Sequence, residues 1–142
     1  TNLGITKKTY DGFFGTNVDE FEMRRLEPSH VKPIYRQRFW DICHCDELPV
    51  GIDWMVFDFA VNAGPGRAMK TLQRVVGAFE DGIIGPKTLE AVRACNRVDI
   101  IEDMANEREA YYRSLSTFKT FGRGWLRRNN ETADQAYFMG QS

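Results

Sequence analysis

The stretch that decides the fold is Gly51-Ile-Asp-Trp-Met-Val-Phe-Asp-Phe-Ala-Val-Asn-Ala-Gly64. Nearly every residue between its two terminal glycines is apolar, which predicts a helix buried on nearly every face. Trp54, Asp58 and Asn62 follow one another at intervals of four, so they share one face of that helix. A carboxylate and an amide inside a buried helix cost free energy unless they are hydrogen-bonded or open onto a cleft. We therefore expect a functional site along this face.

The remaining sequence also favours helices. Apolar residues recur at helical spacing in segments that begin near Thr6, Asp19 and Pro28 before this stretch, and near Pro65, Pro86, Asp99 and Trp125 after it. Pro33 predicts an irregular or late start for the third of these helices. Asp99 and Glu102 resemble a capping box, and Asp81-Gly82 is a strong turn signal. No segment alternates convincingly as a strand, so the sequence predicts an all-α protein.

Composition excludes several classes of protein. The chain has 142 residues, which suits one domain or a compact domain with a small annexe. Its formal net charge of −1 argues against a polyanion-binding surface, and no apolar run approaches the length of a membrane span. No secretory signal is visible at the N-terminus. The three cysteines, Cys43, Cys45 and Cys95, are an odd number, which favours buried free thiols over a disulfide framework or a metal site.

Several segments together resemble one family, the glycoside hydrolase family 108 muramidases, which are lysozyme-like phage endolysins and secretion-associated bacterial proteins. The resemblance covers almost the whole chain in order. Its segments are Thr1-Asn-Leu-Gly-Ile-Thr6, Ile34-Tyr35 with Phe39-Trp40-Asp41, Phe57-Asp-Phe-Ala-Val-Asn-Ala-Gly-Pro-Gly66, Asp81-Gly-Ile-Ile-Gly-Pro-Lys-Thr88 and Thr117-Phe-Lys-Thr-Phe-Gly-Arg-Gly-Trp125.

The resemblance implies two helical units packed together. Residues 1–66 would form a lysozyme-like catalytic domain, and residues 67–142 a small peptidoglycan-binding domain. The implied activity is an N-acetylmuramidase that cuts the β-1,4 bond between N-acetylmuramic acid and N-acetylglucosamine, without metal or organic cofactor. The implied partner is the peptidoglycan glycan strand, with no nucleic acid and no membrane insertion. The protein would be made in the cytoplasm and act at the periplasm or cell wall.

The sequence departs from the family at its catalytic acid. The family carries this glutamate in a Glu-Gly-Gly motif ahead of the segment that corresponds to Thr1–Thr6, and residues 1–142 contain no such motif. Glu20 and Glu22 lie in the wrong place to replace it. The expectation is therefore that the catalytic segment was trimmed from this chain, and that the chain as given is inactive or nearly so.

Candidate site residues each have a structural alternative. Asp58, Asn62 and Thr6 are the candidates for supporting catalysis, by positioning water or stabilising the transition state. Asp58 and Asn62 equally suit a satisfied buried pair where helices cross, and Thr6 favours a helix N-cap. The candidate substrate-binding residues are Asn2, Tyr35, Trp40 and Trp54. Aromatic rings can stack on sugars, although at helical spacing they more often belong to a core.

Three classes of function remain open. The first is the muramidase, and the second is a non-catalytic module that binds peptidoglycan or assists secretion. The third is nucleic-acid binding through the arginine-rich C-terminal segment, which the near-neutral charge disfavours. Lys119, Arg123, Arg127 and Arg128 form a basic cluster around Trp125 that would suit a contact with anionic peptidoglycan. A solvated helix face is the commoner meaning of such a basic cluster. The sequence does not indicate an oligomeric state.

Overall fold

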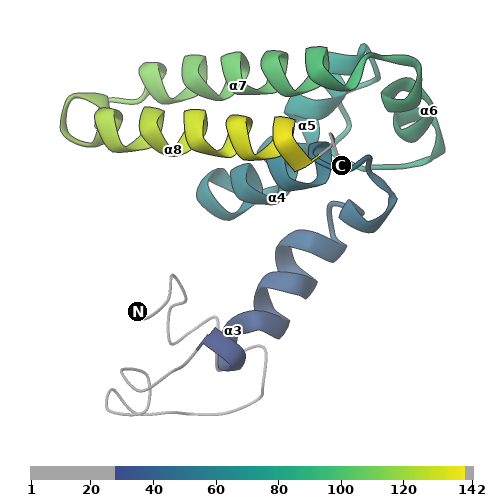
Figure 1. Ribbon diagram of the computed structural model, residues 1–142, viewed down its shortest axis with the longest axis horizontal. Helices are drawn as coiled ribbons and strands as arrows, with labels where there is room; N and C mark the ends of the chain where they lie inside the picture. Colours follow the sequence, from purple (N-terminus) through teal and green to yellow (C-terminus); the bar gives the residue numbers. More distant parts are fainter. Residues whose placement is uncertain (1–27, 140–142) are drawn as a thin grey trace.

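The computed structural model describes residues 28–139, and this part of the chain is all-helical without a strand, as expected. Its six α-helices are α3 (Pro28–Tyr35), α4 (Ile52–Ala63), α5 (Pro65–Val76), α6 (Pro86–Ala94), α7 (Arg97–Ser114) and α8 (Phe118–Met139) (Figure 1). A π-helical segment, Arg36–Asp41, continues α3, and a single 3-10 turn, Cys45–Glu47, precedes α4. The helices expected near Thr6 and Asp19 lie outside the described residues.

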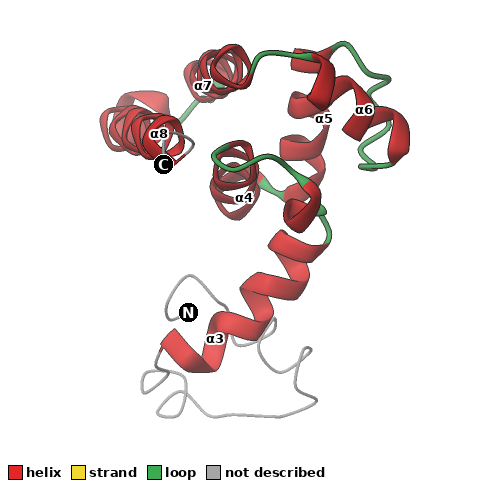
Figure 2. Ribbon diagram, turned by 45° about the vertical axis from the view of Figure 1, so that its right-hand side comes forward, coloured by secondary structure: helices red, strands yellow, loops and turns green. Residues whose placement is uncertain are grey.

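The described helices are arranged around α4. Helices α7 and α8 lie side by side and run in opposite directions, and α4 contacts both of them as well as α5 (Figure 1). Helix α6 packs on α5, while α3 leads away from the other helices (Figure 2). One continuous apolar core joins residues from Cys43 to Ala136, so α4 and the helices after residue 66 share it. The boundary expected at residues 66 and 67 stays a prediction.

The central helix forms as the sequence predicts, and glycines bound it. Gly51 and Gly64 have φ of +95° and +99°, which side chains with a Cβ rarely adopt. The Asp53 carboxylate accepts hydrogen bonds from the backbone N–H groups of Gly51 and Trp54, at 2.9 and 2.6 Å, and so caps the first turn. The helix buries its apolar face through Ile52, Met55, Val56, Phe59 and Ala60.

Helix α5 leads into a loop that one buried side chain organises. Gly77 ends α5 in the left-handed conformation, as expected. The fully buried Gln73 amide donates to the Asp81 carboxylate (2.8 Å), the Ile83 carbonyl (3.0 Å) and the Thr88 hydroxyl (3.1 Å). Its oxygen accepts from the backbone N–H of Gly82 at 2.9 Å. Three of these hydrogen bonds therefore hold the loop that joins α5 to α6, and the fourth ties Gln73 to α6 itself.

Two expected helix starts were wrong, those of α7 and α8. Helix α7 begins at Arg97 because Asn96, not Asp99, is the N-cap, and its side chain accepts from the Asp99 N–H at 3.1 Å. Helix α8 begins at Phe118, well before Trp125. It includes Gly122, which is buried against the Phe118 ring, where a Cβ would clash. Helix α3 begins directly at Pro28. The irregularity expected from Pro33 appears after that residue, as the π-helical segment.

Candidate functional site

The carboxylate of Asp58 lies at the centre of a charged cluster between three helices. The Asp58 side chain is 3% exposed, and it accepts from Nη1 of Arg108 on α7 at 2.8 Å. Arg128 on α8 forms an ion pair with it, and the Thr132 hydroxyl donates to it at 3.0 Å. Arg108 is 1% exposed, and its Nε donates to the Tyr112 hydroxyl at 2.8 Å. These contacts join α4 to α7 and α8.

The cluster keeps Asp58 ionised. Burial by itself would raise the pKa of Asp58, but hydrogen bonds and charge from Arg128 and Arg108 outweigh it and hold the pKa below the ordinary value of 3.8. The same contact raises the pKa of Arg128. A carboxylate with so low a pKa does not carry a proton near neutral pH, so Asp58 is unsuited to act as a general acid.

The described residues do not place Asp58 and Asn62 together on the open cleft that the sequence predicted. Asp58 is sealed from solvent by its partners, whereas Asn62 is exposed and its amide donates to the Asp58 backbone carbonyl of the same helix at 2.9 Å. The two side chains therefore do not line one trough. The geometry favours the structural alternative for Asp58, with side chains of α7 and α8 as its partners. A supporting part of Asp58 and Asn62 in catalysis stays a prediction.

The candidate aromatic residues pack against other aromatic rings. Trp40 and Trp54 both pack against Phe57, with ring centroids 5.5 and 6.0 Å apart. Their indole N–H groups donate to Asp46 at 2.8 Å and to Gln135 at 3.0 Å. Tyr35 packs on Phe39 at 5.7 Å, and burial raises the pKa of its hydroxyl. All three candidates are half-buried.

These contacts leave the proposed sugar-binding role of Tyr35, Trp40 and Trp54 a prediction. Asn2 and Thr6, the remaining candidates, lie outside the described residues.

The cysteines are free, but they differ in exposure. Cys43 and Cys45 are buried, as expected, whereas Cys95 is exposed because it follows the last turn of α6 at the surface. The expectation of burial was therefore wrong for Cys95. Within residues 28–139, no group of three or more His, Cys, Asp or Glu side chains is placed to hold a metal ion. In the same range, no helix combines the length and apolarity that a membrane crossing requires.

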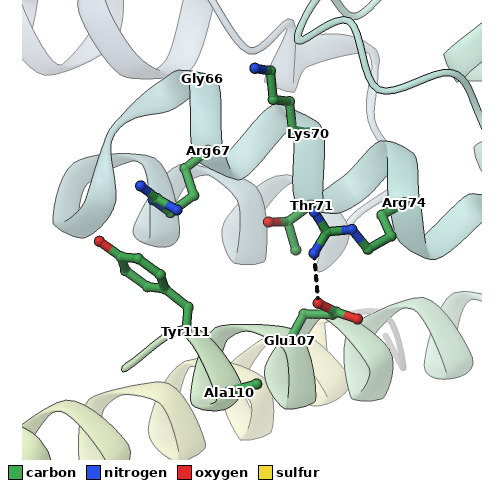
Figure 3. A pocket seen from close by; sticks show the side chains of 8 residues that line it. All are labelled: Gly66, Arg67, Lys70, Thr71, Arg74, Glu107, Ala110 and Tyr111. Carbon is green, nitrogen blue, oxygen red and sulfur yellow. Dashed lines mark hydrogen bonds and ion pairs between the residues drawn. The ribbon is translucent and has the colours of Figure 1, made fainter. Parts of the chain in front are cut away.

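A cavity of about 530 Å³ between α5 and α7 was not anticipated from the sequence (Figure 3). Its lining is cationic and aromatic, with Arg67, Lys70, Thr71 and Arg74 from α5 and Glu107 and Tyr111 from α7. The signal that could have revealed it is the row of basic residues at positions 67, 70 and 74, which share a face of α5 opposite to its buried stripe.

Comparisons with known proteins identify both parts of the chain. Residues 1–64 match the family described as Glycosyl hydrolase 108, and residues 67–130 match the one described as Predicted Peptidoglycan domain. The fold is similar to a solved structure of SagA from Brucella abortus, with a TM-score of 0.91 and 39% sequence identity over 100% of this chain and 82% of that chain. No curated protein matches the chain significantly.

The helical fold and these matches define the class, a glycosyl hydrolase unit followed by a predicted peptidoglycan domain. Within that class, the chain belongs to glycosyl hydrolase family 108.

Proposed function

We propose that this protein is an N-acetylmuramidase that cleaves the β-1,4 bond between N-acetylmuramic acid and N-acetylglucosamine. The observation that carries the proposal is the family membership of residues 1–64, followed directly by the match of residues 67–130 to a predicted peptidoglycan domain. The second part would hold the cell wall while the first part cuts it. The site of action would be the periplasm or cell wall, after synthesis in the cytoplasm.

The chemistry needs a proton donor that the described cluster does not supply. Cleavage requires a carboxylic acid that stays protonated near neutral pH and protonates the leaving oxygen. The low pKa of Asp58 excludes it from that role, and the resemblance assigns the role to a glutamate in a Glu-Gly-Gly motif. Because residues 1–142 contain no such motif, we expect these residues alone to leave peptidoglycan uncut.

Activity is tested by placing a family segment that contains Glu-Gly-Gly ahead of Thr1. The extended protein should clear a suspension of cell walls, and the same protein with that glutamate replaced by glutamine should not. A circular dichroism spectrum and a cooperative melting curve establish that both proteins are folded. Failure of the folded, extended protein to clear the suspension would contradict the muramidase proposal.

The alternative is a module that binds peptidoglycan or assists secretion without cutting. The match of residues 67–130 supports binding independently of catalysis. Sedimentation with purified sacculi separates the two functions, because a binding module is retained and releases no soluble sugar. Retention of the extended protein without soluble products would favour this alternative over the muramidase.

A further inference from the structure

The cavity between α5 and α7 contains a guanidinium that has no carboxylate partner among residues 28–139. The Cζ of Arg67 lies 4.0 Å from the centre of the Tyr111 ring, which is a cation–π contact. Arg74, one of the other cations in the cavity, is already occupied by Glu107 at 3.1 Å and Glu80 at 3.0 Å. Arg67 is exposed, so its N–H groups are available to a ligand.

Further donors surround Arg67. The Thr71 hydroxyl points toward the part of the cavity that Arg67 and Tyr111 occupy (Figure 3), and no residue among those described hydrogen-bonds to it. Gly66 lines the cavity at the first turn of α5, where Gly64 provides no side-chain cap for the backbone N–H groups. The positive end of the helix therefore lies beside the unpaired guanidinium. Lys70 adds a cation at the rim.

We propose that this cavity binds a free carboxylate of the peptidoglycan stem peptide. A guanidinium placed over a ring can present two parallel N–H groups, which match the two oxygens of a carboxylate. Glu107 lines the same cavity, and its carboxylate can accept N–H groups such as those of a peptide, which glycerol phosphate lacks. The inference rests on the proposed function, because it names the part of the cell wall that the second domain recognises.

An exposed apolar surface adjoins the cavity and suits the alkyl parts of such a peptide. The loop after α5 carries Phe79 and Ile83, whose side chains are 85% and 67% exposed. Gln73 holds this loop rigidly, and Glu80 of the loop pairs with Arg74 of the cavity. A Cβ added at Gly82 would lie 3.3 Å from the Lys70 side chain, so the loop borders the cationic row directly.

The test is a titration of the 142-residue chain with the tetrapeptide L-Ala-γ-D-Glu-meso-diaminopimelate-D-Ala, followed by calorimetry and by NMR shifts of α5 and α7. The same peptide with every carboxylate converted to an amide, and glycerol phosphate, are the comparison ligands. The acidic peptide should bind, and the fully amidated peptide and glycerol phosphate should bind at least about tenfold more weakly, as expected for loss of a charge-assisted hydrogen bond.

Variants assign the binding to this cavity. Arg67→Gln should weaken binding of the acidic peptide about tenfold or more, and Thr71→Val, which keeps the side-chain volume, should weaken it several-fold. Arg93→Gln removes an exposed arginine of α6 outside the cavity and should leave binding unchanged. Melting temperatures of all variants are measured in parallel, so that loss of folding is recognised.

Binding of the acidic peptide that Arg67→Gln and Thr71→Val both leave intact would overturn the proposal. Equal binding of the acidic and amidated peptides, preferential binding of glycerol phosphate, or no binding of the acidic peptide at all would also overturn it. Retention of the chain on sacculi in any of these cases would show that peptidoglycan is bound elsewhere on the protein. The proposed function would then survive the failure of this inference.

Discussion

The sequence pattern identifies Asp58 as an unusual residue, but it does not reveal the chemistry of its surroundings. An acidic residue within an apolar helix is equally consistent with a catalytic cleft and with a buried ion pair, and the chain order does not say which helix lies opposite. The partners, Arg108 and Arg128, are 50 and 70 residues away in sequence. Helical spacing alone could therefore identify Asp58 as unusual but could not identify what it binds.

Replacing Asp58 should destabilise the protein strongly. Asp58→Asn keeps the shape of the side chain but leaves the buried Arg108 without a counter-charge, so the free energy of unfolding should fall by about 3 to 5 kcal/mol. Urea denaturation measures the change. Asp103→Asn, at an exposed position of α7, is the matched control and should alter stability by less than about 0.5 kcal/mol. A loss below about 1 kcal/mol for Asp58→Asn would contradict a structural role for the cluster.

At the scale of the elements, apolar spacing predicted α4, α5 and α6 well because their ends are marked locally by glycine and proline. The starts of α7 and α8 were misplaced because they depend on local side-chain contacts that apolar spacing does not show. Gly122 signals a break in isolation, but in the structure it lets the Phe118 ring pack against the helix. The role of Gln73 was also invisible, because a glutamine on a helix gives no sign that three groups of a later loop and one of α6 will surround it.

The loop between α5 and α6 should lose its order when Gln73 is replaced. Gln73→Met keeps much of the buried volume but removes four hydrogen bonds and leaves the buried Thr88 hydroxyl without this partner, which should cost about 2 to 4 kcal/mol. Amide hydrogen exchange at Gly82 and Ile83 should become faster. Gln37→Met, at an exposed position, is the control. Unchanged exchange at both amides in Gln73→Met would show that Gln73 does not hold the loop.

The whole molecule should lose stability in acid, partly through Asp58. Because the pKa of Asp58 is lower in the folded protein than in the unfolded chain, its contribution is complete above about pH 3.9 and disappears as the pH falls through the folded-state pKa. Burial raises the pKa of Asp53, so Asp53 has the opposite effect on how stability depends on pH.

Asp53 is present in both wild type and Asp58→Asn, so its effect cancels when the two proteins are compared. The difference in unfolding free energy between them should shrink as the pH falls from 6 toward 2, as measured by urea denaturation at each pH. A difference that is independent of pH over this range would contradict the assignment of an ionised Asp58.

The fold class and the family were predictable because their signals run along the whole chain. The candidate site was predictable only in part. The sequence identified Asp58 but placed it on an open cleft, whereas the described residues bury its side chain. It also gave no indication that Arg67 of α5 and Tyr111 of α7 would meet. Both contacts depend on how α4, α5, α7 and α8 pack together, and that arrangement is not contained in the periodicity of any one helix.

The identity of the sugar at the new reducing end tests the proposed activity most directly. Soluble fragments released from purified sacculi by the extended protein are reduced with borohydride, hydrolysed and analysed by mass spectrometry. Cleavage of the proposed bond predicts that the reduced sugar is muramitol, and that the glutamate-to-glutamine control yields none. Recovery of glucosaminitol instead, or of peptides without newly reduced sugar, would contradict the assignment of this protein as an N-acetylmuramidase.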